Sequence, residues 1–190
     1  MENESFFIKI FKKMIKENLY LKCFNVYGNL ILRRACVSDV EMILTLINRF
    51  AGSNLMLPRG PRYLYENIRD FLVADSQAEE PDIVACGSLH VLWKDVAEIR
   101  ALAVHPDYQN RGLGSRLVRY LVEDARHIGV ESVFAFTMIE EFFMKLGFVP
   151  KKKEELPSKV WGECSRCPKH FNCDETGLIL KLSGDNREEA

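Results

Sequence analysis

The chain of 190 residues predicts one α+β (α/β) domain, in which helices flank a β-sheet. Two apolar stretches, residues 83–93 and 96–104, are separated only by Lys94 and Asp95, which is typical of a β-hairpin. The segment QNRGLG at 109–114 follows, and its two glycines indicate a turn that a ligand can approach closely. A helix is expected after this turn. Its apolar residues recur at helical spacing, at Leu113, Leu117, Leu121, Val122 and Ala125.

One strand and two helices are expected before the hairpin. Residues 30–33 have the pattern of a short strand, and Ser38 with Glu41 forms the capping-box pattern that opens a helix ending near Gly52. A second helix is expected before the polar linker that ends at Pro81. Its apolar residues are Leu64, Ile68, Phe71 and Leu72.

Strands and a short helix are expected in the rest of the chain. Gly129 should end the helix that follows the glycine turn, and residues 130–137 have the pattern of a strand. Residues 140–146 predict a short helix closed by Gly147, and residues 176–182 predict the last strand.

Three parts of the chain are distinguished by composition. Residues 1–29 are expected to form an amphipathic extension, since an apolar stripe lies opposite several lysines. Such a helix would dock on its own domain or on the second protomer of a homodimer, while a membrane-surface anchor and an unordered segment are the alternatives. The domain is expected to span residues 30–182, including a cysteine-containing insert at 156–175, and residues 183–190 form a polar tail.

Charge and hydropathy narrow the class of protein. The 26 Lys and Arg residues nearly balance the 27 Asp and Glu residues, so no overall basic surface indicates nucleic-acid binding. No apolar run approaches the length of a membrane span, and lysines interrupt the apolar residues where a signal peptide would need an unbroken core. Three of the six cysteines are scattered, at positions 23, 36 and 86, which fits a reducing compartment. We therefore expect a protein of the cytoplasm that does not bind nucleic acid.

The glycine turn suits a pyrophosphate. Backbone amides at the start of a helix, with the positive end of the helix dipole behind them, bind phosphate groups. A tight connection without a ligand is the alternative. Two other phosphate-binding motifs do not match the turn. Residue 117 is a leucine where a dinucleotide-binding motif has its third glycine, and the Gly-Lys-Ser/Thr sequence of a P-loop does not follow.

The order of these elements resembles the GNAT superfamily of N-acetyltransferases. The similarity covers about residues 30–182 and is most specific in AEIRALAVHPDYQNRGLG at 97–114 and EEFFMKLGF at 140–148. It implies a central mixed, mostly antiparallel sheet flanked by helices and acetyl-CoA as the co-substrate. It also implies that a strand lies against the pantetheine arm and that the turn holds the pyrophosphate. The matching residues are Leu102, Ala103 and Val104 in the strand and Gln109, Asn110, Arg111, Gly112, Leu113 and Gly114 in the turn.

Glu98 is the candidate catalytic base. Acetyl transfer to an amine needs a group that removes a proton from the ammonium, and Glu98 falls where histone acetyltransferases of the superfamily have their catalytic glutamate. A structural ion pair with Arg100, on the same face of the strand, is the alternative. Many members carry a tyrosine as the leaving-group acid at the position of Phe143, so the sequence predicts either an unassisted thiolate or another acid, for which Tyr108 and His105 are nearby.

A narrower resemblance suggests the amine. The segments LMLPRG at 55–60 and LPSKVWGECSRCPKHFNCDE at 156–175 are similar to short amino-acid acetyltransferases of the N-acetylglutamate synthase type. This implies acetylation of the α-amino group of L-glutamate in arginine biosynthesis. Arg59, Arg100 and Lys159 are the candidate partners of the substrate carboxylates, and solvated or structural roles are their alternatives. The longer synthases carry an arginine near the position of Met138, so one carboxylate contact that the resemblance implies is absent from this sequence.

The insert carries a cysteine cluster. Cys164, Cys167 and Cys173 would supply three soft ligands to Zn²⁺, with His170 or Asp174 as the fourth. A redox-sensitive thiol pair and ordinary packed thiols are the alternatives.

Two other kinds of function are compatible with the sequence. The same fold could acetylate a protein N-terminus, a polyamine or an antibiotic. A non-catalytic sensor that only binds acyl-CoA is the second alternative, because Phe143 removes the acid that many members use.

Overall fold

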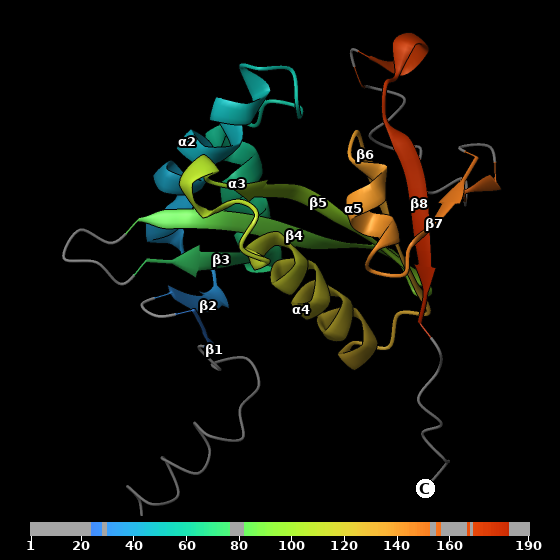
Figure 1. The fold of residues 1–190 in the computed structure, drawn as a ribbon, viewed down its shortest axis with the longest axis horizontal. Helices are drawn as coiled ribbons and strands as arrows, with labels where there is room; N and C mark the ends of the chain where they lie inside the picture. The colour runs from blue at the N-terminus through green and yellow to red at the C-terminus, as the bar shows by residue number, and fades with distance from the viewer. Residues whose placement is uncertain are drawn as a thin grey trace, which may run out of the picture.

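The computed structural model describes residues 24–27, 30–76, 82–152, 155–156, 167 and 169–182. Within this part of the chain, eight strands form one sheet in the order β1-β2-β3-β4-β5-β6-β8-β7 (Figure 1). The strands are β1 (Phe24–Tyr27), β2 (Leu30–Arg34), β3 (Phe71–Asp75), β4 (Ile83–Trp93), β5 (Val96–Val104), β6 (Ser132–Thr137), β7 (Val149–Lys151) and β8 (Thr176–Lys181). All neighbouring strands are antiparallel except β5 and β6, which are parallel. The expected mixed, mostly antiparallel α+β sheet is therefore confirmed.

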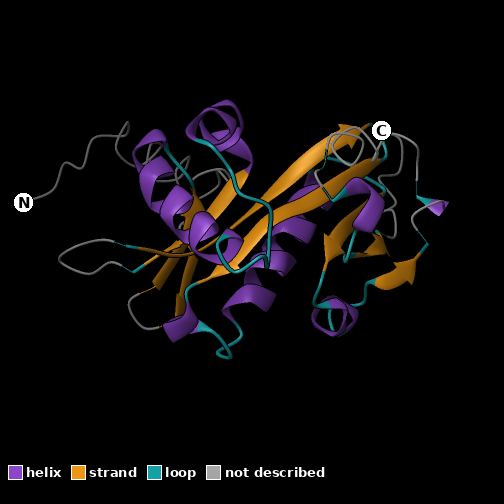
Figure 2. Ribbon diagram, turned by 90° about the horizontal axis from the view of Figure 1, so that it is seen from above, coloured by secondary structure: helices purple, strands orange, loops and turns teal. Residues whose placement is uncertain are grey.

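Helices cover both faces of the sheet (Figure 2). The α-helices are α2 (Val40–Ala51), α3 (Pro61–Asn67), α4 (Leu113–His127) and α5 (Glu140–Met144). Short 3-10 helices are η2 (Val37–Asp39), η3 (Ile68–Asp70), η4 (Pro106–Tyr108) and η7 (His170–Asn172). Among the helices described, none is long and apolar enough to cross a membrane.

Two apolar cores hold the helices on the sheet. Ile43 and Ile47 of α2 are fully buried with Val73 of β3, while Leu121 of α4 is fully buried with Val133 of β6. Complete burial of such a side chain contributes roughly 1.5–3 kcal/mol. Alternate residues of a strand point to opposite faces, so β3, β4 and β5 supply both cores.

The sequence prediction was wrong at residues 71 and 72. Phe71 and Leu72 belong to β3 rather than to a second helix, which ends at Asn67 before the 3-10 turn of η3. Residues 71–74 are a continuous apolar run between two antiparallel strands with helices on both faces, and this environment favours a strand over the helical spacing that includes residues 64 and 68. Two further strands were not expected: β7, and β1, which lies within residues 1–29 and pairs with β2. The rest of the expected amphipathic extension lies outside the described residues.

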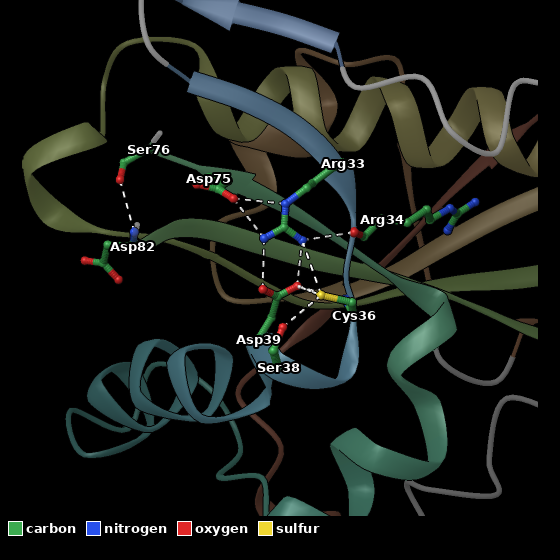
Figure 3. Close-up of polar contacts among 8 residues, drawn as sticks. All are labelled: Arg33, Arg34, Cys36, Ser38, Asp39, Asp75, Ser76 and Asp82. Atoms are coloured by element: carbon green, nitrogen blue, oxygen red, sulfur yellow. Dashed lines mark hydrogen bonds and ion pairs between the residues drawn. The ribbon is translucent and has the colours of Figure 1, made fainter. Parts of the chain in front are cut away.

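A buried ion-pair network joins β2, β3 and the start of α2 (Figure 3). Arg33 donates to Asp39 from Nη1 at 2.6 Å and from Nη2 at 2.9 Å, and to Asp75 from Nε at 3.0 Å. Burial alone would raise the pKa of Asp39, but hydrogen bonds from Arg33 and Cys36 hold that pKa below its usual value. The same bonds to Asp39 and Asp75 raise the pKa of Arg33. This network fixes the start of α2 against the sheet.

Candidate active site

The site begins where β5 separates from β6. The two strands pair only over Val96–Glu98 and Ser132–Phe134, while β5 continues beside β4 to Val104. A bulge allows this, because Cys86 pairs with Ala103 and Ser88 with Arg100, so that residues 101 and 102 lie opposite one residue of β4. Ala101 has a φ of 51°, in the left-handed region. Beyond Glu98, one side of β5 therefore faces an opening.

Two side chains of β4 satisfy carbonyl groups at the bulge. The Ser88 hydroxyl donates to the carbonyl oxygen of Arg100 at 3.2 Å, and the Cys86 thiol donates to that of Ala101 at 3.5 Å. Burial raises the pKa of the Cys86 thiol to about 12, so it keeps the proton that this bond needs. These bonds stabilise the irregular backbone from which the site is built.

A cavity of about 670 Å³ fills the opening. The sequence-predicted residues on its wall are Arg59, Glu98, Arg100, Leu102, Ala103, Val104, Gln109, Asn110, Gly112, Leu113, Gly114, Cys167 and Cys173. Arg111 is not on this wall: it is exposed, and its guanidinium carbon lies 5.8 Å from the ring centroid of Tyr108. Lys159 and Cys164 lie outside the described residues.

The glycine turn has the geometry of an anion-binding loop. Asn110 and Gly112 have φ values of 59° and 77°, and α4 begins at the next residue, Leu113. A Cβ added to Gly112 would meet no atom within 4 Å, so the surface above the turn is open to a ligand. The amides at the start of α4 thus border the cavity where a pyrophosphate would fit.

The backbone of Val104 lies beside this turn. The Gln109 side chain donates from Nε2 to the Val104 carbonyl oxygen at 2.9 Å. His105 donates its amide to Val84 of β4, and alternate residues of a strand direct their backbone groups to opposite edges, so the Val104 amide points toward the opening.

Glu98 and Arg100 form a buried ion pair on the cavity wall. Arg100 donates to Oε2 of Glu98 from Nε at 2.6 Å and from Nη2 at 2.5 Å, and the side chains of Arg100 and Glu98 are 8% and 10% exposed. The ion pair that the sequence analysis gave as the alternative to a catalytic role for Glu98 is therefore present. It places a carboxylate and a guanidinium side by side at the point where β5 and β6 separate.

Phe143 leaves no phenol at the position where many relatives have one. Its ring is buried against Phe142 and Phe148, with centroid distances of 5.1 and 5.2 Å. Of the two other candidate acids, Tyr108 lines the cavity beside the turn. His105 is not among the residues of this wall, and its Nε2 lies 2.7 Å from Nη1 of Arg49.

Much of the cavity wall was not predicted from sequence. Apolar residues of α2, of the α2–α3 connection, of β5, of β6 and of the segment after β6 contribute to it, together with two hydroxyl side chains and one carboxylate. These are Phe50, Leu55, Met56, Leu57, Ile99, Ala101, Phe136, Met138, Ile139, Phe142, Ser115, Thr137 and Glu175. From the sequence, only the apolar residues around Pro58 could have indicated a part of this wall.

The structure does not assemble the proposed zinc site among the residues that it describes. No group of three or more His, Cys, Asp or Glu side chains that could hold a metal occurs there. Asp174, a candidate fourth ligand, instead accepts a hydrogen bond from Lys169 at 2.8 Å. Cys167 and Cys173 are free thiols on the cavity wall.

This arrangement defines a class of protein. Parallel strands that separate around a cavity, a bulged strand along one wall and a glycine turn at the start of a helix are the features expected of an enzyme that uses an acyl-CoA. The model of the acetyltransferase (GNAT) family matches residues 42–148, more than half of the chain. The chain belongs to this family and is an N-acetyltransferase with acetyl-CoA as its co-substrate.

The protein is similar to bacterial amino-acid acetyltransferases. An amino-acid acetyltransferase of Mycobacterium tuberculosis is 36% identical over 136 residues, covering 72% of this chain and 78% of the relative. An uncharacterized N-acetyltransferase of Chlorobaculum tepidum is 35% identical over 154 residues, covering 79% of this chain and 95% of the relative.

Two solved structures resemble the fold over most of the chain. A Mycobacterium tuberculosis protein in complex with CoA and NLQ has a TM-score of 0.68 and 31% identity, covering 80% of this chain and 99% of that one. N-acetylglutamate synthase of Neisseria gonorrhoeae, complexed with CoA and N-acetyl-glutamate, has a TM-score of 0.73 and 26% identity. The comparison covers 83% of this chain but only 36% of the synthase.

Proposed function

We propose that the protein acetylates the α-amino group of L-glutamate, as an N-acetylglutamate synthase of arginine biosynthesis. The observation that carries the proposal is that Arg59 and Arg100, from two separate elements, line the same cavity as Glu98. Two guanidinium groups suit a substrate with two carboxylates, since guanidinium binds carboxylate in a planar, two-bonded geometry. The similarity to the Neisseria gonorrhoeae N-acetylglutamate synthase, which was solved in complex with CoA and N-acetyl-glutamate, supports an amino-acid substrate.

The two arginines are assigned different carboxylates. An α-amino acid carries its ammonium and carboxylate on one carbon, and the adjacent Glu98 and Arg100 complement this pair of charges. Arg59 comes from the α2–α3 connection and is assigned the side-chain carboxylate.

The co-substrate is assigned to the opposite part of the wall. The amides of the glycine turn, with residues Gln109, Asn110, Gly112, Leu113 and Gly114, would hold the pyrophosphate, and Arg111 would contribute from outside the cavity. Residues 102–104 of β5 would lie along the pantetheine arm. This fits the open surface above Gly112 and the opening-facing amide of Val104.

Transfer is proposed to occur by direct attack. Glu98 takes a proton from the substrate ammonium, the freed amine forms a bond to the thioester carbon, and the Val104 amide donates to the developing oxyanion. The carbon–sulfur bond then breaks, and the CoA thiolate leaves and takes up a proton, for which Tyr108 is the candidate donor. In this scheme the substrate amine itself attacks the thioester, so no covalent enzyme intermediate is needed.

The test is turnover with acetyl-CoA against the twenty amino acids. Glutamate should be the best substrate and should exceed glutamine, and equal activity on both, or none on either, would refute the proposal. Arg59→Ala should raise the KM for glutamate about tenfold or more, because it removes a charge-assisted contact worth about 1.5–3 kcal/mol. Arg62→Ala is the matched control, since it removes an exposed guanidinium three residues away that pairs with Glu66.

Arg100→Ala should differ from Arg59→Ala in its kinetics. It should raise the KM for every amino acid and also lower kcat, because Arg100 holds Glu98 in place. A protein that binds acetyl-CoA but acetylates no amino acid, polyamine or peptide N-terminus would instead be an acyl-CoA-binding module.

A further inference from the structure

The backbone of Arg59 is fixed by a side chain of α2. The Asn48 amide donates from Nδ2 to the Arg59 carbonyl oxygen at 3.1 Å, and its Oδ1 accepts from the Arg59 amide at 3.1 Å. Paired bonds between a side-chain amide and one residue's backbone restrict rotation of that residue. A loop residue of the cavity wall is thereby tied to a regular helix.

The side chain of Arg59 is fixed by an aromatic ring. Its guanidinium carbon lies 4.1 Å from the ring centroid of Tyr63, in the first turn of α3. This is a cation–π contact, which favours one position of a long, flexible side chain. Arg59 also lines the cavity, so the stacked guanidinium lies at the site.

Tyr63 is held in turn by His90, which is itself held by Asp70. His90 Nδ1 lies 2.9 Å from Oδ2 of Asp70, and a carboxylate only accepts, so this nitrogen carries a hydrogen. In the neutral ring Nε2 is then the acceptor, and it lies 3.3 Å from the Tyr63 hydroxyl, which donates to it. The Tyr63 and His90 rings also meet edge to face, with centroids 6.2 Å apart.

We propose that Asn48 and Tyr63, with His90 behind Tyr63, are positioning residues that hold Arg59 ready for the side-chain carboxylate of the substrate. The proposal rests on the glutamate function above and explains how a loop arginine could select an acidic amino acid. A solvated arginine loses much of its rotational freedom on binding, whereas one already fixed in place loses little. The supporting groups come from α2, α3, η3 and β4, so the whole α2–α3 side of the domain contributes to selectivity.

Steady-state kinetics of three single variants provide the test. Tyr63→Leu removes the ring and should raise the KM for glutamate about three- to tenfold, with kcat and the KM for acetyl-CoA unchanged within about twofold. Tyr63→Phe keeps the ring but loses the bond from the hydroxyl to His90, so its increase should be smaller. Asn48→Ala should also raise the KM for glutamate, and it tests the proposal independently if Tyr63→Leu fails to fold.

Two exposed neighbours are matched controls. Tyr65→Leu makes the same exchange on the same helix, at a residue that is 51% exposed. Thr45→Ala removes an exposed polar side chain one turn before Asn48. The Thr45 hydroxyl donates to the carbonyl oxygen of Glu41 within the same helix. Both controls should leave the KM for glutamate unchanged.

The decisive measurement is Tyr63→Leu combined with Arg59→Ala. If Tyr63 acts through Arg59, then Tyr63→Leu should change the KM for glutamate by less than about twofold once Arg59 is absent. The inference would be overturned if Tyr63→Leu changed the KM for glutamate equally with and without Arg59. It would also be overturned if Arg59→Ala raised the KM for glutamate while Tyr63→Leu and Asn48→Ala both left it unchanged. An unchanged KM in Arg59→Ala itself would remove Arg59 as the carboxylate receptor and overturn the inference together with its basis.

Discussion

Replacement of Gly112 by valine should separate co-substrate binding from stability. Gly112 has a φ of 77°, where a residue with a Cβ is strained by about 1–2 kcal/mol. No atom of the protein lies within 4 Å of the added Cβ, so no steric clash adds to this cost. For a domain of this size the strain should lower Tm by roughly 2–8 °C. The branched side chain would, however, stand on the surface that the pyrophosphate must approach, so acetyl-CoA binding should be lost.

Gly129→Val is the matched control for this variant. Gly129 lies just after the other end of α4, has a φ of 84°, and also has no atom within 4 Å of an added Cβ. Both variants should therefore lose similar stability, while calorimetric titration with acetyl-CoA should show loss of affinity only for Gly112→Val. Equal affinities in the two folded variants would show that the turn is only a connection and would refute the assignment of the pyrophosphate to it.

Three further substitutions test the base, the bulge and the ion-pair network. Glu98→Gln should lower kcat about 10²- to 10⁴-fold, with a smaller deficit at high pH where more amine is deprotonated, and a pH–rate profile that overlays the wild type would exclude the base. Ser88→Ala should lower kcat/KM because it removes the hydrogen bond to the Arg100 carbonyl at the bulge. The control Ser132→Ala loses a hydrogen bond to the Asp95 carbonyl and should change only Tm. Equal kcat/KM values in the two variants would show that the bulge does not need the Ser88 bond. Asp39→Asn should cost about 1.5–3 kcal/mol at neutral pH. The pKa of Asp39 is lowered in the folded state, so the stability that its carboxylate contributes is fully present above the unfolded pKa and is lost as pH falls through the folded pKa. The unfolding free energies of wild type and variant should therefore converge as pH falls below about 4. A difference that stays constant with pH would exclude this ion-pair origin.

The structural elements on the proposed co-substrate side of the site could be predicted from local sequence because they are local. A glycine turn, the strand before it and the helix after it are adjacent in the chain, and each leaves a pattern of its own. The bulge leaves no such pattern: the residue with positive φ is Ala101, which composition does not distinguish from any other strand residue. The same holds for Phe71, whose strand became evident only from the pairing of β3 with β2 and β4.

The substrate side could be predicted only as single residues. Arg59 was identified from a short resemblance, but its support comes from Asn48, Tyr63 and His90, which lie up to 31 positions away in the chain. Each of these residues is unremarkable in its own segment. Their common role follows from the sheet, which brings β4 beside the helices that carry the other two.

The positions of the proposed base, Glu98, and of the strand proposed to hold the co-substrate both follow from one irregularity of the sheet. β5 is bound on both sides only as far as Glu98, because its pairing with β6 ends there. The bulge begins three residues later, on the β4 side, and lets β5 remain with β4 while β6 continues beside β8. Glu98 is therefore the last residue of the rigid, doubly paired part of β5 and the first to face the cavity, which is where a base must be both fixed in place and accessible to the amine.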